Sequence, residues 1–303
     1  MKEIVRLKDE VRDALAAHQP VVALESTVIA HGLPRPKNLE TAKQMEQIVR
    51  DHGAVPATIA MLSGNLQAGL QASELELLAT SDEIKKLSVR DLPIGVARQW
   101  NGATTVATTM WIARRAGIRV FATGGIGGVH RGDLPDISAD LPELARTAMI
   151  VVCSGAKIVL DLPATREWLE TNGVTVAGYQ CDELPAFYSR TSGLAVDVRC
   201  DTPEEVVQIF QAQRELEFPS ALLVAVPVPG EFEVESSTLN EVLDDSLSEA
   251  VRENISGRDL TPFLLARMSE RSGGATLRAN IALLENNANV AAEIARALCS
   301  ANC

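Results

Sequence analysis

The sequence lacks the features that identify several common classes of protein. None of its five cysteines stands in a C-x-x-C pair, and the chain has only four histidines, so we expect free thiols and no cysteine nucleophile. No apolar run approaches the length of a membrane span, and the charged N-terminus has no apolar core like that of a secretory signal. We therefore expect a cytoplasmic protein without a membrane partner.

Positive charge is also scarce. The chain has 28 Lys and Arg residues against 40 Asp and Glu residues, which gives a formal net charge of −12 at pH 7. An acidic chain is unsuited to a broad nucleic-acid surface. A small basic pocket for one phosphate group is compatible with this charge, so we expect a small-molecule substrate and no nucleic acid.

What the sequence does contain is a regular alternation of apolar runs and amphipathic segments. Buried strands are expected at residues 21–24, 55–62, 118–122, 149–153, 174–179, 195–199 and 221–228. Helices are expected at residues 3–18, 38–52, 73–80, 103–117, 163–172, 202–216, 236–254 and 277–301. This order predicts an α/β fold with a largely parallel sheet flanked by helices. Because no repeat or linker is visible, we predict a single large domain over residues 1–303 with a helical C-terminal part.

The densest set of chemical groups lies at residues 121–161. A strand ends there in the loop TGGIGG at residues 123–128, which is either a phosphate-cradling loop or a tight turn. Lys157 follows the uncharged run at residues 149–156. A neutral amine at such a place can attack an aldose carbon and form a Schiff base, and the alternative is a lysine that extends from a strand end into solvent. Cys153, inside the apolar run, is expected to be a core residue.

Other ionisable and hydroxyl side chains are also placed for chemistry. Glu25 follows a buried strand, where desolvation favours acid–base use, although a carboxylate tied to a backbone or lysine partner fits equally well. Thr104 and Thr105 lie at the start of the helix expected at residues 103–117 and either bind an anion or cap that helix. Three aspartates also lie close together in the sequence, Asp133, Asp136 and Asp140. They either supply oxygen ligands for a hard divalent cation or form a solvated acidic loop.

Several longer motifs carry a specific resemblance. They are LESTVIAHGLPRP, GATTVATTM, VFATGGIGGVHRG, DISADL and CSGAKIVLD. Together they resemble the pseudouridine-5′-phosphate glycosidase family, and the resemblance runs from about residue 4 to about residue 298. The family cleaves the C–C glycosidic bond of pseudouridine 5′-phosphate reversibly, giving uracil and ribose 5-phosphate.

The resemblance implies roles for individual residues. Lys157 matches the nucleophile that forms an imine with ribose C1′, Glu25 matches the proton donor, and Asp136 matches the ligand of a divalent cation, usually Mn²⁺. Substrate contacts are implied at Lys86, Val106, His130, Ser138, Ala139, Asp140 and Asn280, and we add Thr105 for the phosphate. The resemblance also implies a homotrimer.

The chemistry agrees with these roles. A C-glycoside leaves through carbon, so the oxocarbenium route of ordinary glycosidases is poor. Attack by a lysine opens the ribose and provides an iminium that accepts electrons, while a carboxyl acid protonates the base. Two other functions use a similar pocket: a Schiff-base aldolase acting on another sugar phosphate, and a non-catalytic nucleotide sensor.

Overall fold

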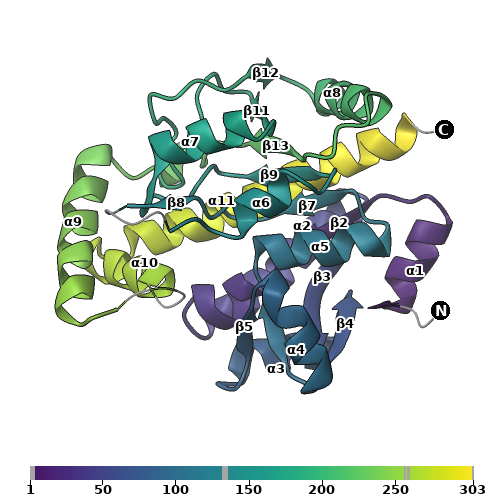
Figure 1. The fold of residues 1–303 in the computed structure, drawn as a ribbon, viewed down its shortest axis with the longest axis horizontal. Coiled ribbons are helices and arrows are strands. Elements are labelled where there is room, and N and C mark those ends of the chain that lie inside the picture. Colours follow the sequence, from purple (N-terminus) through teal and green to yellow (C-terminus); the bar gives the residue numbers. More distant parts are fainter. Residues whose placement is uncertain (1–3, 132–135, 256, 258–259, 302–303) are drawn as a thin grey trace.

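The computed structural model describes residues 4–131, 136–255, 257 and 260–301. A large sheet runs through the molecule and is covered by helices (Figure 1). Its strands lie in the order β1-β4-β3-β2-β7-β9-β13-β11-β12, with β6 beside β3 and β5 beside β6. They are β1 (Val5–Leu7), β2 (Val21–Leu24), β3 (Val55–Leu62), β4 (Asn65–Ala68), β5 (Lys85–Leu87), β6 (Gly102–Thr104), β7 (Val120–Ala122), β9 (Ile150–Cys153), β11 (Thr175–Tyr179), β12 (Val198–Cys200) and β13 (Leu222–Ala225).

The central strands are parallel and buried over their whole length. β2 pairs in parallel with β3 and β7, and β9 pairs in parallel with β7 and β13. β3 pairs antiparallel with β4 and β6 near one side of the sheet. Strands covered on both faces need apolar side chains at every position, which explains the continuous apolar runs in the sequence. The predicted α/β class with a largely parallel sheet is confirmed.

Helices cover both faces of the sheet. The long α11 (Ala275–Ser300), yellow in Figure 1, packs behind the sheet against β2, β7 and β9, with α2 (Lys37–Asp51) and α8 (Pro203–Glu215) beside it. In front of the sheet, α5 (Val106–Ala116) packs against β2, β3 and β4, next to α6 (Asp140–Leu144). The other helices are α1 (Asp9–Ala16), α3 (Ala72–Thr80), α4 (Leu92–Ala97), α7 (Leu162–Thr171), α9 (Ser236–Arg252) and α10 (Leu260–Arg271). None of the helices in the described residues is long and apolar enough to cross a membrane.

The structure corrects several predicted elements. Residues 3–18 do not form one helix, because residues 5–7 pair with β4 as an edge strand before α1 begins. The helix predicted over residues 103–117 starts only at Val106, since Gly102–Thr104 pairs with β3 and β5. The sequence also gave no prediction of α10, which packs against α9.

The order of the central strands creates the functional edge of the sheet. β2, β7 and β9 are neighbours and parallel, so their carboxyl ends meet at the same edge. Glu25, Thr123 and Ser154 are the first residues after these strands. Ligands of open parallel sheets bind outside such carboxyl ends, and a large cavity of this protein lies there.

Candidate active site

A cavity of about 650 Å³ lies at the carboxyl ends of the central strands. Most of the candidate site residues line it: Glu25, Lys86, Thr105, Val106, His130, Asp136, Ser138, Ala139, Asp140, Lys157 and Asn280. They come from segments that are far apart in the sequence, including β5, the start of α5, the short strand β8 (Val129–His130) and α11. The structure therefore brings together all the residues to which the family resemblance assigned a role, and Thr105 with them.

Glu25 lines this cavity at the carboxyl end of β2. Only 8% of its surface is exposed, and its carboxylate accepts a hydrogen bond from the Thr123 hydroxyl. Burial raises the pKa of the Glu25 carboxyl, and the positive charge of Lys157 and the Thr123 hydrogen bond offset part of that effect. A carboxyl with a raised pKa keeps its proton to higher pH, which suits a general acid.

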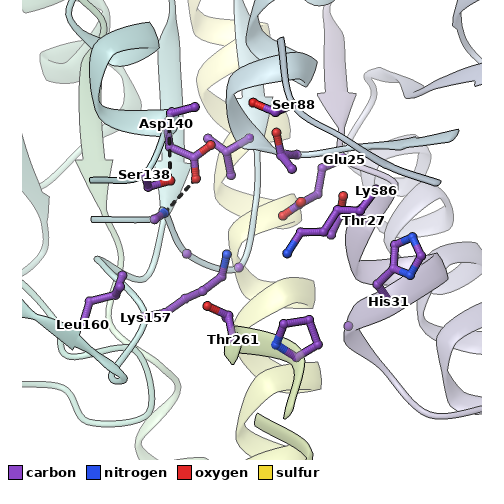
Figure 2. Close-up of a pocket in the computed structure, with 18 of the residues that line it drawn as sticks. Glu25, Thr27, His31, Lys86, Ser88, Ser138, Asp140, Lys157, Leu160 and Thr261 are labelled. Carbon is purple, nitrogen blue, oxygen red and sulfur yellow. Dashed lines mark hydrogen bonds between the residues drawn. The ribbon is translucent and has the colours of Figure 1, made fainter. Parts of the chain in front are cut away.

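Lys157 approaches the cavity from the loop after β9. Gly155 has a left-handed φ of +81°, and a Cβ at that position would lie 2.0 Å from the Pro185 carbonyl oxygen, so this turn requires glycine. The backbone N–H of Lys157 donates to Ile126 O at 3.1 Å, which fixes the residue against the glycine loop. Figure 2 shows Lys157 and Lys86 entering the cavity from different walls. The charges of both act on the Glu25 carboxyl, that of Lys157 more strongly.

Asp140 holds two walls of the cavity together. One carboxylate oxygen accepts from the N–H of Ala107 at 2.8 Å, and the other accepts from the N–H of Gly127 at 2.8 Å. These bonds join the first turn of α5 to the glycine loop. A Cβ on Gly127 would lie 2.2 Å from the Ser138 Oγ, so glycine is also needed for this close approach. Asp140 is the first residue of α6, after Ala139 at the N-cap position, and its carboxylate binds α5 and the glycine loop.

The two threonines before α5 have structural partners. Thr104 is fully buried, its hydroxyl donates to Ile59 O at 2.8 Å, and its N–H donates to the Ser26 Oγ at 2.8 Å. Thr105 caps α5, because its side chain accepts from the N–H of Thr108. The capping alternative is therefore confirmed for Thr105, which still lines the cavity. Thr104 does not line it, and the idea that it binds an anion is wrong.

Asp136 is the predicted metal ligand. It is exposed at the cavity wall, and its carboxylate accepts no hydrogen bond within the described residues. Across residues 4–131, 136–255, 257 and 260–301, no group of three or more His, Cys, Asp or Glu side chains could hold a metal ion. Asp133 lies outside the described residues. A single free carboxylate fits a hard cation that keeps most of its water ligands, as Mg²⁺-like ions do.

None of the four cysteines that the structure describes lines this cavity. Cys153, Cys181, Cys200 and Cys299 are free, as predicted, and Cys303 lies outside the described residues. Burial raises the pKa of Cys153 to about 12, so its thiol stays protonated and unreactive near neutral pH.

Sequence reasoning missed part of the cavity wall. A π-helical turn, Val28–Gly32, follows Glu25 and contributes Val28 and His31. Another wall comes from α10, through Thr261, Pro262 and Leu265. The π-helical turn has no sequence signature of its own, but such turns are frequent at functional sites. The contribution of α10 depends on tertiary packing alone.

Known proteins have sequences similar to this chain over almost its whole length. A family model described as "Indigoidine synthase A like protein" matches residues 10–297. A protein of Geobacillus kaustophilus (strain HTA426) named pseudouridine-5′-phosphate glycosidase is 53% identical over 300 residues, covering 98% of this chain and 100% of its own length. A protein of the same name from Symbiobacterium thermophilum is 52% identical over 304 residues, covering 98% and 99% of the two chains.

Solved structures match as well. The prealnumycin C-glycosynthase AlnA, in complex with ribulose 5-phosphate, has a TM-score of 0.92 and 39% identity, covering 100% of this chain and 99% of its own. An indigoidine synthase A-like protein from Thermotoga maritima has a TM-score of 0.90 and 39% identity, covering 98% and 97% of the two chains. The chain therefore belongs to the indigoidine synthase A-like family, and the resemblance to the pseudouridine-5′-phosphate glycosidases seen in its motifs is confirmed.

Proposed function

We propose that this protein is an enzyme that reversibly cleaves the C–C glycosidic bond of pseudouridine 5′-phosphate, giving uracil and ribose 5-phosphate. The observation that carries the proposal is the pairing of Glu25 and Lys157 in one cavity. The Glu25 carboxyl is buried, its pKa is raised by that burial, and the charge of Lys157 acts on it. The names of the relatives and the C-glycosynthase chemistry of one structural neighbour support the same bond type.

Lys157 acts as the nucleophile. Its amine attacks ribose C1′, the C1′–O bond breaks with its electron pair on the ring oxygen, and a proton passes from the nitrogen to that oxygen. The resulting secondary amine still carries uracil on C1′. Attack of this kind divides a difficult cleavage into easier steps.

Glu25 then supplies the proton that releases the base. The proton adds to uracil C5, the C1′–C5 bond breaks, and its electron pair restores the double bond of the ring. The nitrogen lone pair of Lys157 forms the C1′=N bond at the same time. Water hydrolyses this imine, which gives ribose 5-phosphate and restores the free lysine. The sum of the steps is pseudouridine 5′-phosphate plus water giving uracil plus ribose 5-phosphate.

The phosphate and a divalent cation occupy the polar walls in this proposal. Lys86 provides positive charge, and Arg90 and Arg146 line the same cavity. Ser138, Thr105 and the backbone around Val106 and Ala139 provide polar groups nearby. Asp136 would hold a cation such as Mn²⁺, which supplies charge that binds and orients the phosphorylated substrate. A homotrimer remains a prediction from the family resemblance.

Uracil release from pseudouridine 5′-phosphate in the presence of Mn²⁺ tests the proposal. We expect turnover that is lost in Lys157→Ala, with free pseudouridine as a poor substrate. A Schiff-base aldolase would instead form an imine with a sugar phosphate but release no uracil. A nucleotide sensor would bind the nucleotide without turning it over. Either result would contradict the proposed function.

A further inference from the structure

Asn287 is a buried amide on α11 that hydrogen-bonds to the ends of two strands at the site. None of its surface is exposed. Its Nδ2 group donates to Thr123 O at 2.9 Å and to the Ser154 Oγ at 3.1 Å, with a longer contact of 3.4 Å to Gly124 O. A polar side chain in an apolar helix face is unfavourable unless it is fully hydrogen-bonded. These bonds explain why the amide is tolerated there.

The Thr123 carbonyl needs this donor because it lies where the regular sheet ends. Backbone pairing of β7 with β9 continues past the strands, since Thr123 N donates to Val152 O at 3.0 Å and Ser154 N donates to Gly124 O at 2.9 Å. The Thr123 carbonyl turns toward α11 instead and accepts from Asn287. A buried carbonyl without a donor destabilises a fold. Asn287 therefore fixes the orientation of the Thr123 residue.

Thr123 connects this amide to the proposed acid. Its side-chain hydroxyl donates to the Glu25 carboxylate, while its own carbonyl accepts from Asn287. Thr123 and Asn287 are fully buried and Glu25 is 8% exposed, so water cannot easily replace either bond. If the Thr123 backbone turns, the hydroxyl loses its alignment with Glu25.

We infer that Asn287 is a positioning residue for the reaction: through Thr123 it holds the Glu25 carboxyl in the orientation needed to deliver a proton. This inference rests on the proposed function. Asn287 does not line the cavity, so it cannot contact the substrate directly. Asn280, seven residues earlier on the same helix, does line it. Residues seven apart lie on the same helix face. On this face of α11, Asn280 lies at the cavity wall, and Asn287 binds the residues that follow β7 and β9.

The same helix offers a matched control. Asn286 is half-buried, and its Nδ2 reaches Pro227 O at 3.5 Å rather than the strand ends. Asn286→Ala removes an amide of the same chemistry, one position away, without touching Thr123. We expect its kcat and KM to stay within about twofold of wild type, as for substitutions outside the site.

The test compares two steps of the reaction in Asn287→Ala and Asn287→Leu. If the alanine variant fails to fold, the leucine variant replaces it, because leucine has the same branched shape and number of heavy atoms as asparagine but no hydrogen-bonding group. We expect kcat for uracil release to fall by about 10-fold or more, because general acids contribute about 10²–10⁴-fold and depend on geometry. KM should change little, and borohydride trapping of ribose 5-phosphate on Lys157 should stay within about threefold, because that imine forms without proton delivery to uracil.

A double substitution tests the route through Thr123. Thr123→Val should lower kcat in the same way, and combining it with Asn287→Ala should add little further loss, since both act on one connection. Additive losses, equal losses of trapping and turnover, or failure of both Asn287 variants to fold would overturn the inference in favour of a structural role. The outcome is separate from the proposed function, which fails only if wild-type protein releases no uracil.

Discussion

Replacing Glu25 by glutamine isolates the proton-transfer step. Glutamine keeps the volume of the side chain and an oxygen that can accept from the Thr123 hydroxyl, but it cannot give up a proton to uracil. Loss of a general acid lowers a rate by about 10²–10⁴-fold, which corresponds to about 3–5 kcal/mol of barrier. Because Glu25 is 8% exposed, water is a poor replacement, and we expect a loss toward the upper end of that range.

Two assays show which step of the reaction the substitution slows. Ultraviolet absorbance measures the release of uracil. Borohydride trapping with ribose 5-phosphate measures imine formation on Lys157. We expect Glu25→Gln to trap the sugar while base release collapses. A folded variant that turns over within a few-fold of wild type would refute the assignment and make His130, which also lines the cavity, the next acid to test.

The same variant gives a test that needs no substrate. Burial raises the pKa of Glu25 in the folded protein, so its contribution to stability is complete below the unfolded-state pKa and is lost as pH rises through the folded-state pKa. Glutamine does not ionise. In denaturant titrations between about pH 4 and pH 8, the stability of Glu25→Gln relative to wild type should therefore increase with pH. A relative stability that falls with rising pH would contradict the raised pKa.

Other substitutions test the remaining walls of the site. Asp136→Ala should lose bound Mn²⁺, measured by metal analysis, and most turnover; unchanged activity after chelation would rule out the metal role. Lys86→Ala should weaken pseudouridine 5′-phosphate far more than it affects residual turnover of free pseudouridine, whereas equal losses would indicate a structural role. Asp140→Ala should lower the melting temperature by several degrees, because it removes acceptors from two buried N–H groups, and an unchanged melting temperature would mean that these bonds do not hold the walls together.

The centre of the fold could be predicted because its signal is local. Continuous apolar runs mark strands buried on both faces, and the residues that follow them, such as Glu25 and Thr123, must then lie at one edge of a parallel sheet. The motif resemblance added Lys86, His130 and Asn280, which local patterns alone would not have brought to the same cavity. The structure places Lys86, His130 and Asn280 on the walls of the cavity.

The features that the sequence did not predict depend on contacts between residues that are far apart in the chain. The strand at residues 5–7 exists only because Val5 pairs with Leu66, some sixty positions away, so the helical spacing of its residues was misleading. Asn287 reads in the sequence as a polar interruption of an amphipathic helix, and its role requires knowing that Thr123 O lies beside it. The bonds of Asp140 to Ala107 and Gly127 depend in the same way on the meeting of α6, α5 and the glycine loop.

The central claim is that Lys157 forms a covalent bond to ribose C1′ during C–C cleavage. The most direct test incubates wild-type protein with pseudouridine 5′-phosphate and borohydride, then maps the modified peptide by mass spectrometry while uracil release is measured in the same sample. We predict that the mass of reduced ribose 5-phosphate appears on Lys157 and that inactivation follows its appearance. Modification of another lysine such as Lys86, or uracil release that persists undiminished in Lys157→Ala, would contradict the account.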